Sequence, residues 1–460
     1  MHIHILGIAG TYMAGIALIA KDLGHKVTGH DKCCYSPMKD QLVKNDIKVV
    51  LGYGEPNSLP PADLFLIGNV IKRDNLLLSE ILNKNYNYCS APEWLRLNVL
   101  NNKWVLSVAG THGKTTTTAI LVWLLERAGL NPGFLVGGLL QNFGVSARNT
   151  ESNFFVIEAD EYDTAFFDKR PKFLHYKPKT LIINNLEFDH ADIYSSLDAI
   201  EQQFGYLLRT VPDNGQVVFP KEFGSIAALV ADYCRSDVKT TSLKDPNADW
   251  VIKSDNNYKN FNIMQRGITE AEGLWQVEGA HNAANLLAAA AAASHAGVSL
   301  SAIAKGISDF KSVKRRLELK GVYGGVTVYD DFGHHPTAIA AVLASVNKKY
   351  TNNNVFAILD LSAVAYTLRS GILSDDFASA LSCTEHAFII LNEDTDSDFD
   401  WSGWGNNISF VDVYNNVNIM VKSLLEVVTH GDTIVCFGSR DLTSVFKILE
   451  SELTVCAMKN

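Results

Sequence analysis

The 460-residue sequence contains no apolar run near the roughly 20 residues that a membrane-spanning helix needs. Its first residues, MHIHILGIAG, reach a glycine turn before the apolar core of a signal peptide is formed. Its seven cysteines are scattered, odd in number and free of CxxC spacing, so they encode neither a disulfide framework nor a zinc site. We therefore expect a cytoplasmic protein that does not bind a membrane.

An excess of positive charge is also lacking. The formal net charge of -10 argues against a nucleic-acid partner, and any anionic ligand must be bound by a local group of residues. Hydrophobic residues make up 47% of the chain and charged residues 20%, which is the usual composition of a globular protein. A chain of 460 residues is too long for one hydrophobic core, so several domains are expected.

Short apolar runs alternate with amphipathic helical stretches along most of the chain, a pattern typical of parallel α/β sheets. We predict an α/β fold with domains at residues 1–101, 102–312 and 313–460. The outer two are expected to be Rossmann-like, and the middle one to be a parallel sheet with a phosphate loop. Helices are expected at 91–100, from the phosphate loop to Ala128, and in HNAANLLAAAAAASHAG, whereas 221–275 indicates only short strands and loops. The expected strands are HIHIL, KVTGHD, LFLIGN, WVLSVA, FFVIEAD, TLIINN, VTVYDDF, VFAILD, HAFIIL and TIVCFGS.

The segment GTHGKTT lies directly between the apolar strand WVLSVA and a helix. In such a turn, backbone N–H groups and the helix N-terminus bind phosphate oxygens, Lys114 neutralises the β and γ oxygens, and the Thr115 hydroxyl binds Mg²⁺. The spacing GxxGKT is shorter than the common GxxxxGK[ST]. The alternative is a tight turn with a solvated lysine, which the flanking strand and helix disfavour.

Polar residues follow two further apolar strands, where ligands for Mg²⁺ are expected. After FFVI, Glu158 is the best metal candidate because it is nearest the apolar run, and a loop cap or a solvated charge is the expected role of Asp163 and of Asp192. For His190, metal ligation and a buried hydrogen bond are equally open. The other candidates in these two segments are Asp160, Glu161, Asn185 and Asp189.

The N-terminal glycine turn only partly matches a dinucleotide fingerprint. Glycines stand at positions 7, 10 and 15, but Ala9 and Tyr12 occupy positions where GxGxxG requires glycine, so NAD or FAD is weakly indicated. A diphosphate can still bind at the helix N-terminus. The alternative is a turn that serves only close packing of helix and strand.

Taken together, the motifs GTHGKTTTT, EADEYD, NNLEFDHAD, GAHNAANLLAA, KRRLELKG and DDFGHHPTA, in this order, resemble the Mur ligase family of ATP-dependent peptidoglycan ligases. The N-terminal turn is similar to the uridine-nucleotide domain of members that act on UDP-N-acetylmuramate. Within that group, YSPMKDQL and FFVIEADEYDTAFFDKR resemble the members that attach the murein tripeptide L-alanyl-γ-D-glutamyl-meso-diaminopimelate. Members that attach L-alanine are the alternative.

The resemblance implies a role for individual residues, with Lys114, Glu158 and His190 in catalysis. Mg²⁺ is implied at Thr115, Glu158 and His190, and His112 is implied near the carboxylate of the sugar nucleotide. Asn282 is implied at adenine, Arg316 at the γ-phosphate and Asp331 at the ribose. The ATP-binding loop implied by the family comprises Ala109, Gly110, Thr111, His112, Gly113, Lys114, Thr115 and Thr116. The residues implied in UDP-sugar binding are Gly7, Ala9, Gly10, Met13, Asp31, Asn69 and His112.

The sequence departs from the family at two places. Several relatives carry a carbamylated lysine near a second metal, but ADIYSSLDAI after His190 contains no lysine, so no carbamate is predicted. In the third domain, LDLSAVAYTLRSG lacks the usual arginine pattern, with Arg369 as a substitute, and CFGSRDLTS differs from the usual glycine-rich loop. KSVKRRLELKG is predicted to be a hinge. The rival classes are a nicotinamide-dependent redox enzyme, a folylpolyglutamate-type ligase and a nucleotide sensor without enzymatic activity.

Overall fold

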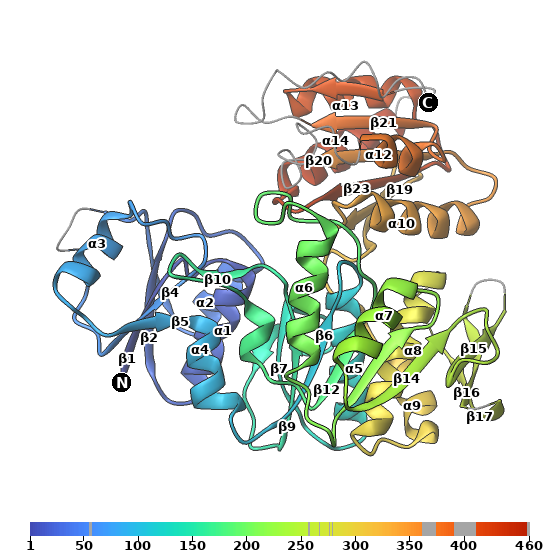
Figure 1. The fold of residues 1–460 in the computed structure, drawn as a ribbon. Coiled ribbons are helices and arrows are strands. Elements are labelled where there is room, and N and C mark those ends of the chain that lie inside the picture. The colour runs from blue at the N-terminus through green and yellow to red at the C-terminus, as the bar shows by residue number, and fades with distance from the viewer. Residues whose placement is uncertain are drawn as a thin grey trace.

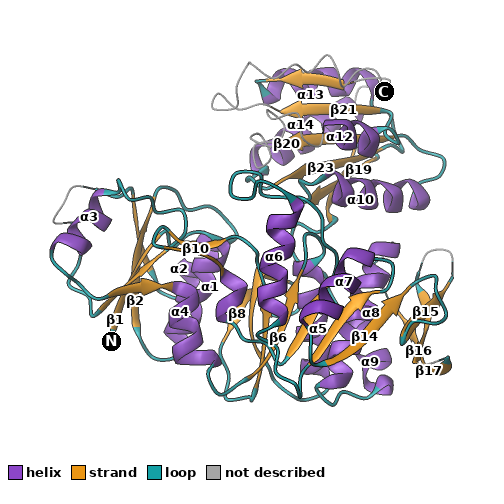
Figure 2. Ribbon diagram, viewed as in Figure 1, coloured by secondary structure: helices purple, strands orange, loops and turns teal. Residues whose placement is uncertain are grey.

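The chain forms three α/β domains, each built on its own sheet, and the predicted fold class is confirmed (Figure 1). The structure is a computed structural model that describes residues 1–54, 58–255, 258–265, 267–275, 277, 279–360, 374–390 and 411–457. Helices lie on the faces of the sheets (Figure 2). The predicted domain boundaries, at 101/102 and 312/313, lie in segments that connect one sheet to the next and stay predictions.

The first sheet has five parallel strands in the order β3-β2-β1-β4-β5. The connection after β1 leads to β2 on one side, whereas the connection after β4 leads to β5 on the other side. This reversal creates a crevice at the carboxyl ends of β1 and β4, where such sheets bind ligands. The predicted helix at 91–100 is an α-helix that continues as a π-helix. The strands are β1 (His2–Leu6), β2 (Lys26–Asp31), β3 (Lys48–Leu51), β4 (Leu64–Ile67) and β5 (Tyr88–Ser90). The helices are α1 (Thr11–Asp22), α2 (Met38–Lys44), α3 (Leu76–Asn83), α4 (Ala91–Leu95) and η1 (Arg96–Leu100).

The middle sheet has ten strands in the order β17-β16-β15-β14-β13-β12-β6-β9-β7-β8. The segment 221–275 contains an antiparallel edge, β15 to β17, that the sequence indicated only weakly. The strands are β6 (Trp104–Ala109), β7 (Gly133–Leu140), β8 (Val145–Arg148), β9 (Phe154–Glu158), β12 (Thr180–Ile183), β13 (Gln216–Pro220), β14 (Asp237–Ser242), β15 (Trp250–Ser254), β16 (Asn260–Gln265) and β17 (Ile268–Leu274). The hairpin and helical segments are β10 (Asp163–Ala165), β11 (Asp168–Pro171), η2 (Lys172–His175), α5 (Lys114–Arg127), α6 (Leu197–Leu208), α7 (Gly224–Tyr233), α8 (Ala280–His295), α9 (Leu300–Gly306) and η3 (Ile307–Asp309).

The alanine-rich helix α8 packs on the sheet, as predicted, and on α5. Its alanines from 288 to 293 are all buried, because small side chains allow the two helices and the sheet to approach closely. This packing fixes the start of α8 beside the phosphate loop.

The third sheet has six strands in the order β18-β19-β23-β20-β21-β22, all parallel except β18. Arg369 and most of LDLSAVAYTLRSG lie outside the described residues. The strands are β18 (Glu318–Tyr323), β19 (Val326–Asp331), β20 (Val355–Asp360), β21 (His386–Ile390), β22 (Val411–Tyr414) and β23 (Thr433–Gly438). The helices are α10 (Pro336–Lys349), α12 (Ser374–Leu381), α13 (Val417–Val427) and α14 (Thr443–Ala457).

The first and middle domains share one hydrophobic core, in which α1 packs on β7 and β8. A Cβ at Gly15 would lie 2.2 Å from Leu135 Cδ1 and 3.2 Å from Ala147 Cβ, so glycine permits this contact. The buried Gln41 side chain accepts a hydrogen bond of 2.7 Å from the backbone N–H of Ser146. At the tip of the β10–β11 hairpin, Phe167 lies against Tyr88 of the first domain. These two domains are therefore firmly joined.

The connection to the third domain changes partners within the predicted hinge, KSVKRRLELKG. The Lys314 N–H donates to Leu139 of β7 (3.0 Å), whereas the Arg315 N–H donates to Glu318 (2.9 Å). Arg315 has φ 61°, and its side chain forms an ion pair of 3.2 Å with Asp330 rather than facing solvent. Residues 318–321 belong to β18, so the pivot lies near Lys314 and Arg315.

Candidate active site

The phosphate loop joins β6 to α5, and its shape depends on two glycines. Gly110 and Gly113 have φ of 124° and 74°, in the region that favours glycine. A Cβ would lie 2.9 Å from the Asn185 carbonyl oxygen at the first position and 2.6 Å from Asn285 Oδ1 at the second. The His112 N–H donates to Asn185 Oδ1 at 2.8 Å. The side chains that follow β12 and the start of α8 thus hold the loop.

Lys114 is buried in a cage of carboxylates. Its Nζ lies 2.8 Å from Glu161 Oε2 and 3.9 Å from Asp160 Oδ1. Burial lowers the pKa of Lys114, but the charges of Glu161 and Asp160 outweigh this effect and raise the pKa above its usual value. The lysine therefore remains a cation that can exchange a carboxylate partner for a phosphate.

Thr115, Glu158 and Arg316 meet at the start of α5. The Thr115 hydroxyl donates to Glu158 Oε1 (3.0 Å) and accepts from Arg316 Nη2 (3.0 Å). Glu158 Oε2 accepts from the Gly137 N–H at 2.7 Å. Burial raises the pKa of Glu158, although Lys114 opposes the shift. Arg316 thus brings a cation from the third-domain side to the residue predicted to hold Mg²⁺.

His190 lies with Asp160 and Glu161. Its Nε2 is 3.5 Å from Glu161 Oε1, and one ligand atom from each of His190, Asp160 and Glu161 lies within 4.8 Å of the others. Burial lowers the pKa of His190, but the hydrogen bond to Glu161 and the charge of Asp189 raise it to about 9. The Thr115 hydroxyl and the carboxylates of this region are the oxygen ligands that Mg²⁺ prefers, so the donors fit such an ion.

A second cluster joins the phosphate loop to the third domain. His112 Nε2 lies 3.1 Å from Glu187 Oε2, which also accepts a hydrogen bond of 2.7 Å from the hydroxyl of Thr337 in α10. The rings of His112 and His335 have centroids 4.3 Å apart. Burial raises the pKa of Glu187, but His112 and Thr337 outweigh this effect and lower the pKa to about 2. Glu187 thus connects the two domains directly beside the phosphate loop.

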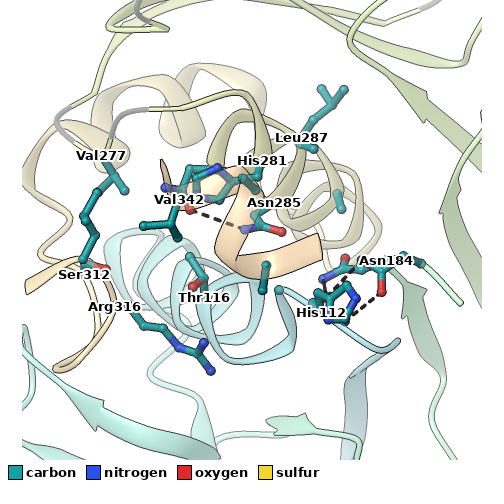
Figure 3. A pocket seen from close by; sticks show the side chains of 18 of the residues that line it. His112, Thr116, Asn184, Val277, His281, Asn285, Leu287, Ser312, Arg316 and Val342 are labelled. Atoms are coloured by element: carbon teal, nitrogen blue, oxygen red, sulfur yellow. Dashed lines mark hydrogen bonds between the residues drawn. The ribbon is translucent and has the colours of Figure 1, made fainter. Parts of the chain in front are cut away.

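A cavity of about 930 Å³ extends from the loop between α8, α10 and the linker, and suits a small-molecule ligand (Figure 3). In Figure 3, His112 and Thr116 of the phosphate loop lie below His281 and Asn285 of α8, and Arg316 lies at the lower left. Of the residues assigned to ATP by the family resemblance, those that line the cavity are His112, Gly113, Thr116, Asn282, Arg316 and Asp331.

Asp331 has both carboxylate oxygens occupied by backbone groups. It accepts from the N–H groups of Leu317 and Gly333, each at 2.7 Å. Burial raises the pKa of Asp331. Its side chain therefore fixes the linker and the FGHHP turn, while its predicted contact with ribose stays a prediction.

The residues predicted to bind the UDP-sugar gather at the carboxyl end of the first sheet. The Ala9 N–H donates to Asp31 Oδ2 at 2.7 Å, and Gly10 is the N-cap residue of α1. Gly7 has φ 82°, and its Cβ position is 3.2 Å from Val70, next to Asn69. Met13 is buried in α1. The turn thus leaves a helix N-terminus at the crevice, where a diphosphate can bind.

Several site residues were missed or misjudged from the sequence. Asp163 is buried and pairs with Lys169, so a solvated or capping role was wrong, whereas Asp192 is exposed. Asn285 lies one helical turn after Asn282, a spacing that signals a shared face. Glu161 was among the expected candidates, whereas the contacts of Lys172 and Glu187 had no local signal. Within the described residues, no helix is both long and apolar enough to cross a lipid bilayer.

The fold and the phosphate loop define a multidomain α/β enzyme that uses a nucleoside triphosphate. Three family profiles match the chain: "Mur ligase family, catalytic domain" at 2–101, "Mur ligase middle domain" at 108–293 and "Mur ligase, glutamate ligase domain" at 315–440. The chain belongs to the Mur ligase family, and it is an ATP-dependent ligase that forms a carbon–nitrogen bond.

Two bacterial relatives are named UDP-N-acetylmuramate–L-alanyl-γ-D-glutamyl-meso-2,6-diaminoheptandioate ligase. The protein of Haemophilus influenzae is 44% identical, over 85% of this chain and 86% of its own length. The protein of Escherichia coli is 45% identical, over 85% of each chain. A UDP-N-acetylmuramate–L-alanine ligase of Aquifex aeolicus is 31% identical, over 82% of this chain and 81% of its own. The crystal structure of a murein peptide ligase from Psychrobacter arcticus matches with a TM-score of 0.78 and 35% identity, over 99% of both chains.

Proposed function

We propose that the chain joins the tripeptide L-alanyl-γ-D-glutamyl-meso-diaminopimelate to UDP-N-acetylmuramate in the cytoplasm, as a step of peptidoglycan recycling. The main support is the identity of 44% and 45% to two ligases named for this tripeptide, against 31% to a ligase named for L-alanine. The arrangement of Lys114, Thr115 and Arg316 around one point supports the use of ATP in this reaction.

A carboxylate must be activated before an amine can attack it. An oxygen of the sugar-nucleotide carboxylate attacks the γ-phosphorus of ATP, the bond to the β–γ bridging oxygen breaks, and ADP leaves an acyl phosphate behind. The peptide amine then attacks the carbonyl carbon, and the tetrahedral intermediate expels inorganic phosphate. Lys114 and Arg316 bring positive charge to the phosphate loop, which reduces repulsion between the two anions and stabilises the transferring group.

Thr115, Glu158 and His190 are the residues that we propose to hold Mg²⁺, with Asp160 and Glu161 beside His190. When bound, Mg²⁺ neutralises charge on the phosphoryl oxygens. The Thr115 hydroxyl contacts both Glu158 and Arg316, which brings a candidate metal ligand and a phosphate-binding cation to one point.

ATP is proposed to occupy the cavity of about 930 Å³, with its phosphates at 109–116. Asn282 would contact adenine, Arg316 the γ-phosphate and Asp331 the ribose side. The UDP moiety is proposed to bind at Gly7, Ala9, Gly10, Met13, Asp31 and Asn69. Because the lining combines the middle domain with the linker and α10, bound ATP would hold the third domain close and exclude water from the acyl phosphate.

The alternative function is the addition of L-alanine to the same sugar nucleotide, since both reactions use the same phosphate chemistry. A folylpolyglutamate-type ligase is a further alternative, but it has no need for a UDP-binding first domain. The glycine turn that ends at the N-terminus of α1 favours a diphosphate ligand in that domain.

Phosphate release from ATP and Mg²⁺ with UDP-N-acetylmuramate, measured with either the tripeptide or L-alanine, tests this proposal. We expect release and a product of the corresponding mass only with the tripeptide. In the variant Lys114→Ala, kcat should fall by roughly 10²- to 10³-fold because a charge that stabilises the transferring phosphoryl group is lost. Release only with L-alanine would assign the alternative function, and no release with either acceptor would refute the proposal.

A further inference from the structure

Lys172 is a buried lysine at the boundary of the first and middle domains. It begins η2, directly after the β10–β11 hairpin, and is 7% exposed. Its Nζ lies 2.9 Å from Asp160 Oδ2 and faces the rings of Tyr12 (5.6 Å) and Tyr162 (5.4 Å). Lysine is rarely buried unless its charge has a specific role or partner.

The contacts of Lys172 connect it to the phosphate loop and to the glycine turn of the first domain. Asp160, its partner, has its other carboxylate oxygen 3.9 Å from Lys114 of the phosphate loop. Tyr12, on its other side, is the second residue of α1, whose N-terminus follows the glycine turn of the first domain. Lys172 therefore lies between the two turns that are suited to bind phosphate groups.

The reaction requires a carboxylate in this region. The sugar nucleotide must extend from the first domain to the γ-phosphate, and its carboxylate must therefore pass between α1 and the phosphate loop. Lys114 and Arg316 are both assigned to the phosphates of ATP, so a further cation is needed for the incoming carboxylate. The Lys172 ammonium group has three N–H donors, and in the part of the chain that the structure describes only Asp160 accepts a hydrogen bond from Nζ.

We propose that Lys172 binds the carboxylate of the sugar nucleotide and directs it towards the γ-phosphate. This inference rests on the proposed function. The ion pair of 2.9 Å with Asp160 holds the ammonium group at this position. An ordinary structural ion pair would instead hold only the hairpin and η2 against the end of β9.

Binding calorimetry of Lys172→Met with two nucleotides distinguishes these roles. UDP-N-acetylglucosamine has the same diphosphate as UDP-N-acetylmuramate but lacks the lactyl carboxylate. We expect the variant to lose roughly 10- to 100-fold in affinity for UDP-N-acetylmuramate, as for a lost charged hydrogen bond, and less than about threefold for the analogue. Lys169→Met is the matched control, because Lys169 lies in the adjoining β10–β11 hairpin, is exposed and pairs with Asp163.

Equal losses for both nucleotides would overturn the proposal and assign Lys172 to the diphosphate, and unchanged affinities would leave only a structural ion pair. If Lys172→Met does not fold, Lys172→Gln preserves a hydrogen bond to Asp160 while it removes the charge, and the same pattern is expected. Wild-type protein that binds neither nucleotide would refute the proposed function itself and this inference with it. Normal wild-type binding of both nucleotides with unchanged variants would refute the role of Lys172 alone.

Discussion

Buried charges in the reaction centre occur in pairs that ligands can separate. Lys114 pairs with Glu161, and Lys172 pairs with Asp160. Removal of one partner leaves the other charge buried without compensation, which costs more than removal of both. Single substitutions here therefore need a measurement of stability beside each measurement of activity.

Two hydrogen-bonded histidines of the first sheet, His4 and His30, differ from these pairs, because burial lowers the pKa of each and so disfavours the charged form. His4 donates or accepts hydrogen bonds with Thr28 Oγ1 (2.7 Å) and His30 Nδ1 (2.9 Å). Burial, followed by the proximity of His30 and His2, lowers the pKa of His4 to about 3. The folded protein protonates His4 less readily than the unfolded chain does. The contribution of His4 to stability is therefore fully present above the pKa of the unfolded chain and is lost as the pH falls below that value.

We expect acidification from about pH 7.5 to about pH 5 to remove about 2 kcal/mol of stability through His4 alone. Thermal melting at a series of pH values measures this loss. In His4→Gln the slope of Tm against pH should be shallower, whatever the absolute Tm of the variant. Parallel slopes for both proteins would contradict the assignment, and His430→Gln serves as control because His430 is exposed and lies in the third domain, away from His4 and His30.

At the scale of elements, α1 serves both the sugar-nucleotide turn and the attachment to the middle domain. Its N-terminus faces the crevice, while Gly15, one turn later, lets the helix contact β7. A change in this contact therefore also shifts the turn at Gly10.

Gly15→Val should destabilise the joint between the two domains by about 1–3 kcal/mol, because the new side chain overlaps Leu135 and Ala147. We expect a lower Tm and a weaker affinity for UDP-N-acetylmuramate. The double variant Gly15→Val, Leu135→Ala should recover part of both losses, since it makes room for valine. Losses that simply add in the double variant would show that the overlap with Leu135 is not the cause.

Local signals in the sequence predicted the elements that carry local chemistry. Strand, glycine turn and helix are contiguous around Lys114, so this unit was predictable from one segment. The contacts of Lys172 with Tyr12, and of Glu187 with Thr337, join residues far apart in the chain, and no spacing encodes them. Asp163 is buried because it lies in a short hairpin. The sequence contains no apolar pattern that would have predicted this hairpin.

At the scale of the whole molecule, the two joints differ in chemistry. The first and middle domains share an apolar core, whereas the third domain meets the phosphate loop through polar contacts of Arg316, His335 and Thr337. Polar contacts exchange readily with water, and the pivot near Lys314 and Arg315 is a short segment. We therefore expect the third domain to move while the other two remain one unit.

Thr337→Val tests this motion because it removes the hydroxyl that donates to Glu187 at 2.7 Å. Without nucleotide, small-angle scattering should give a larger radius of gyration for the variant, and an ATP analogue should restore the wild-type value. The KM for ATP should rise by roughly three- to tenfold, as for one lost hydrogen bond, with a smaller change in kcat. Thr454→Val is the matched control, since the Thr454 hydroxyl donates to the carbonyl of Glu450 within its own helix. Scattering curves that coincide for all three proteins, with or without the analogue, would mean that Glu187 and Thr337 do not control closure and that the linker is no hinge.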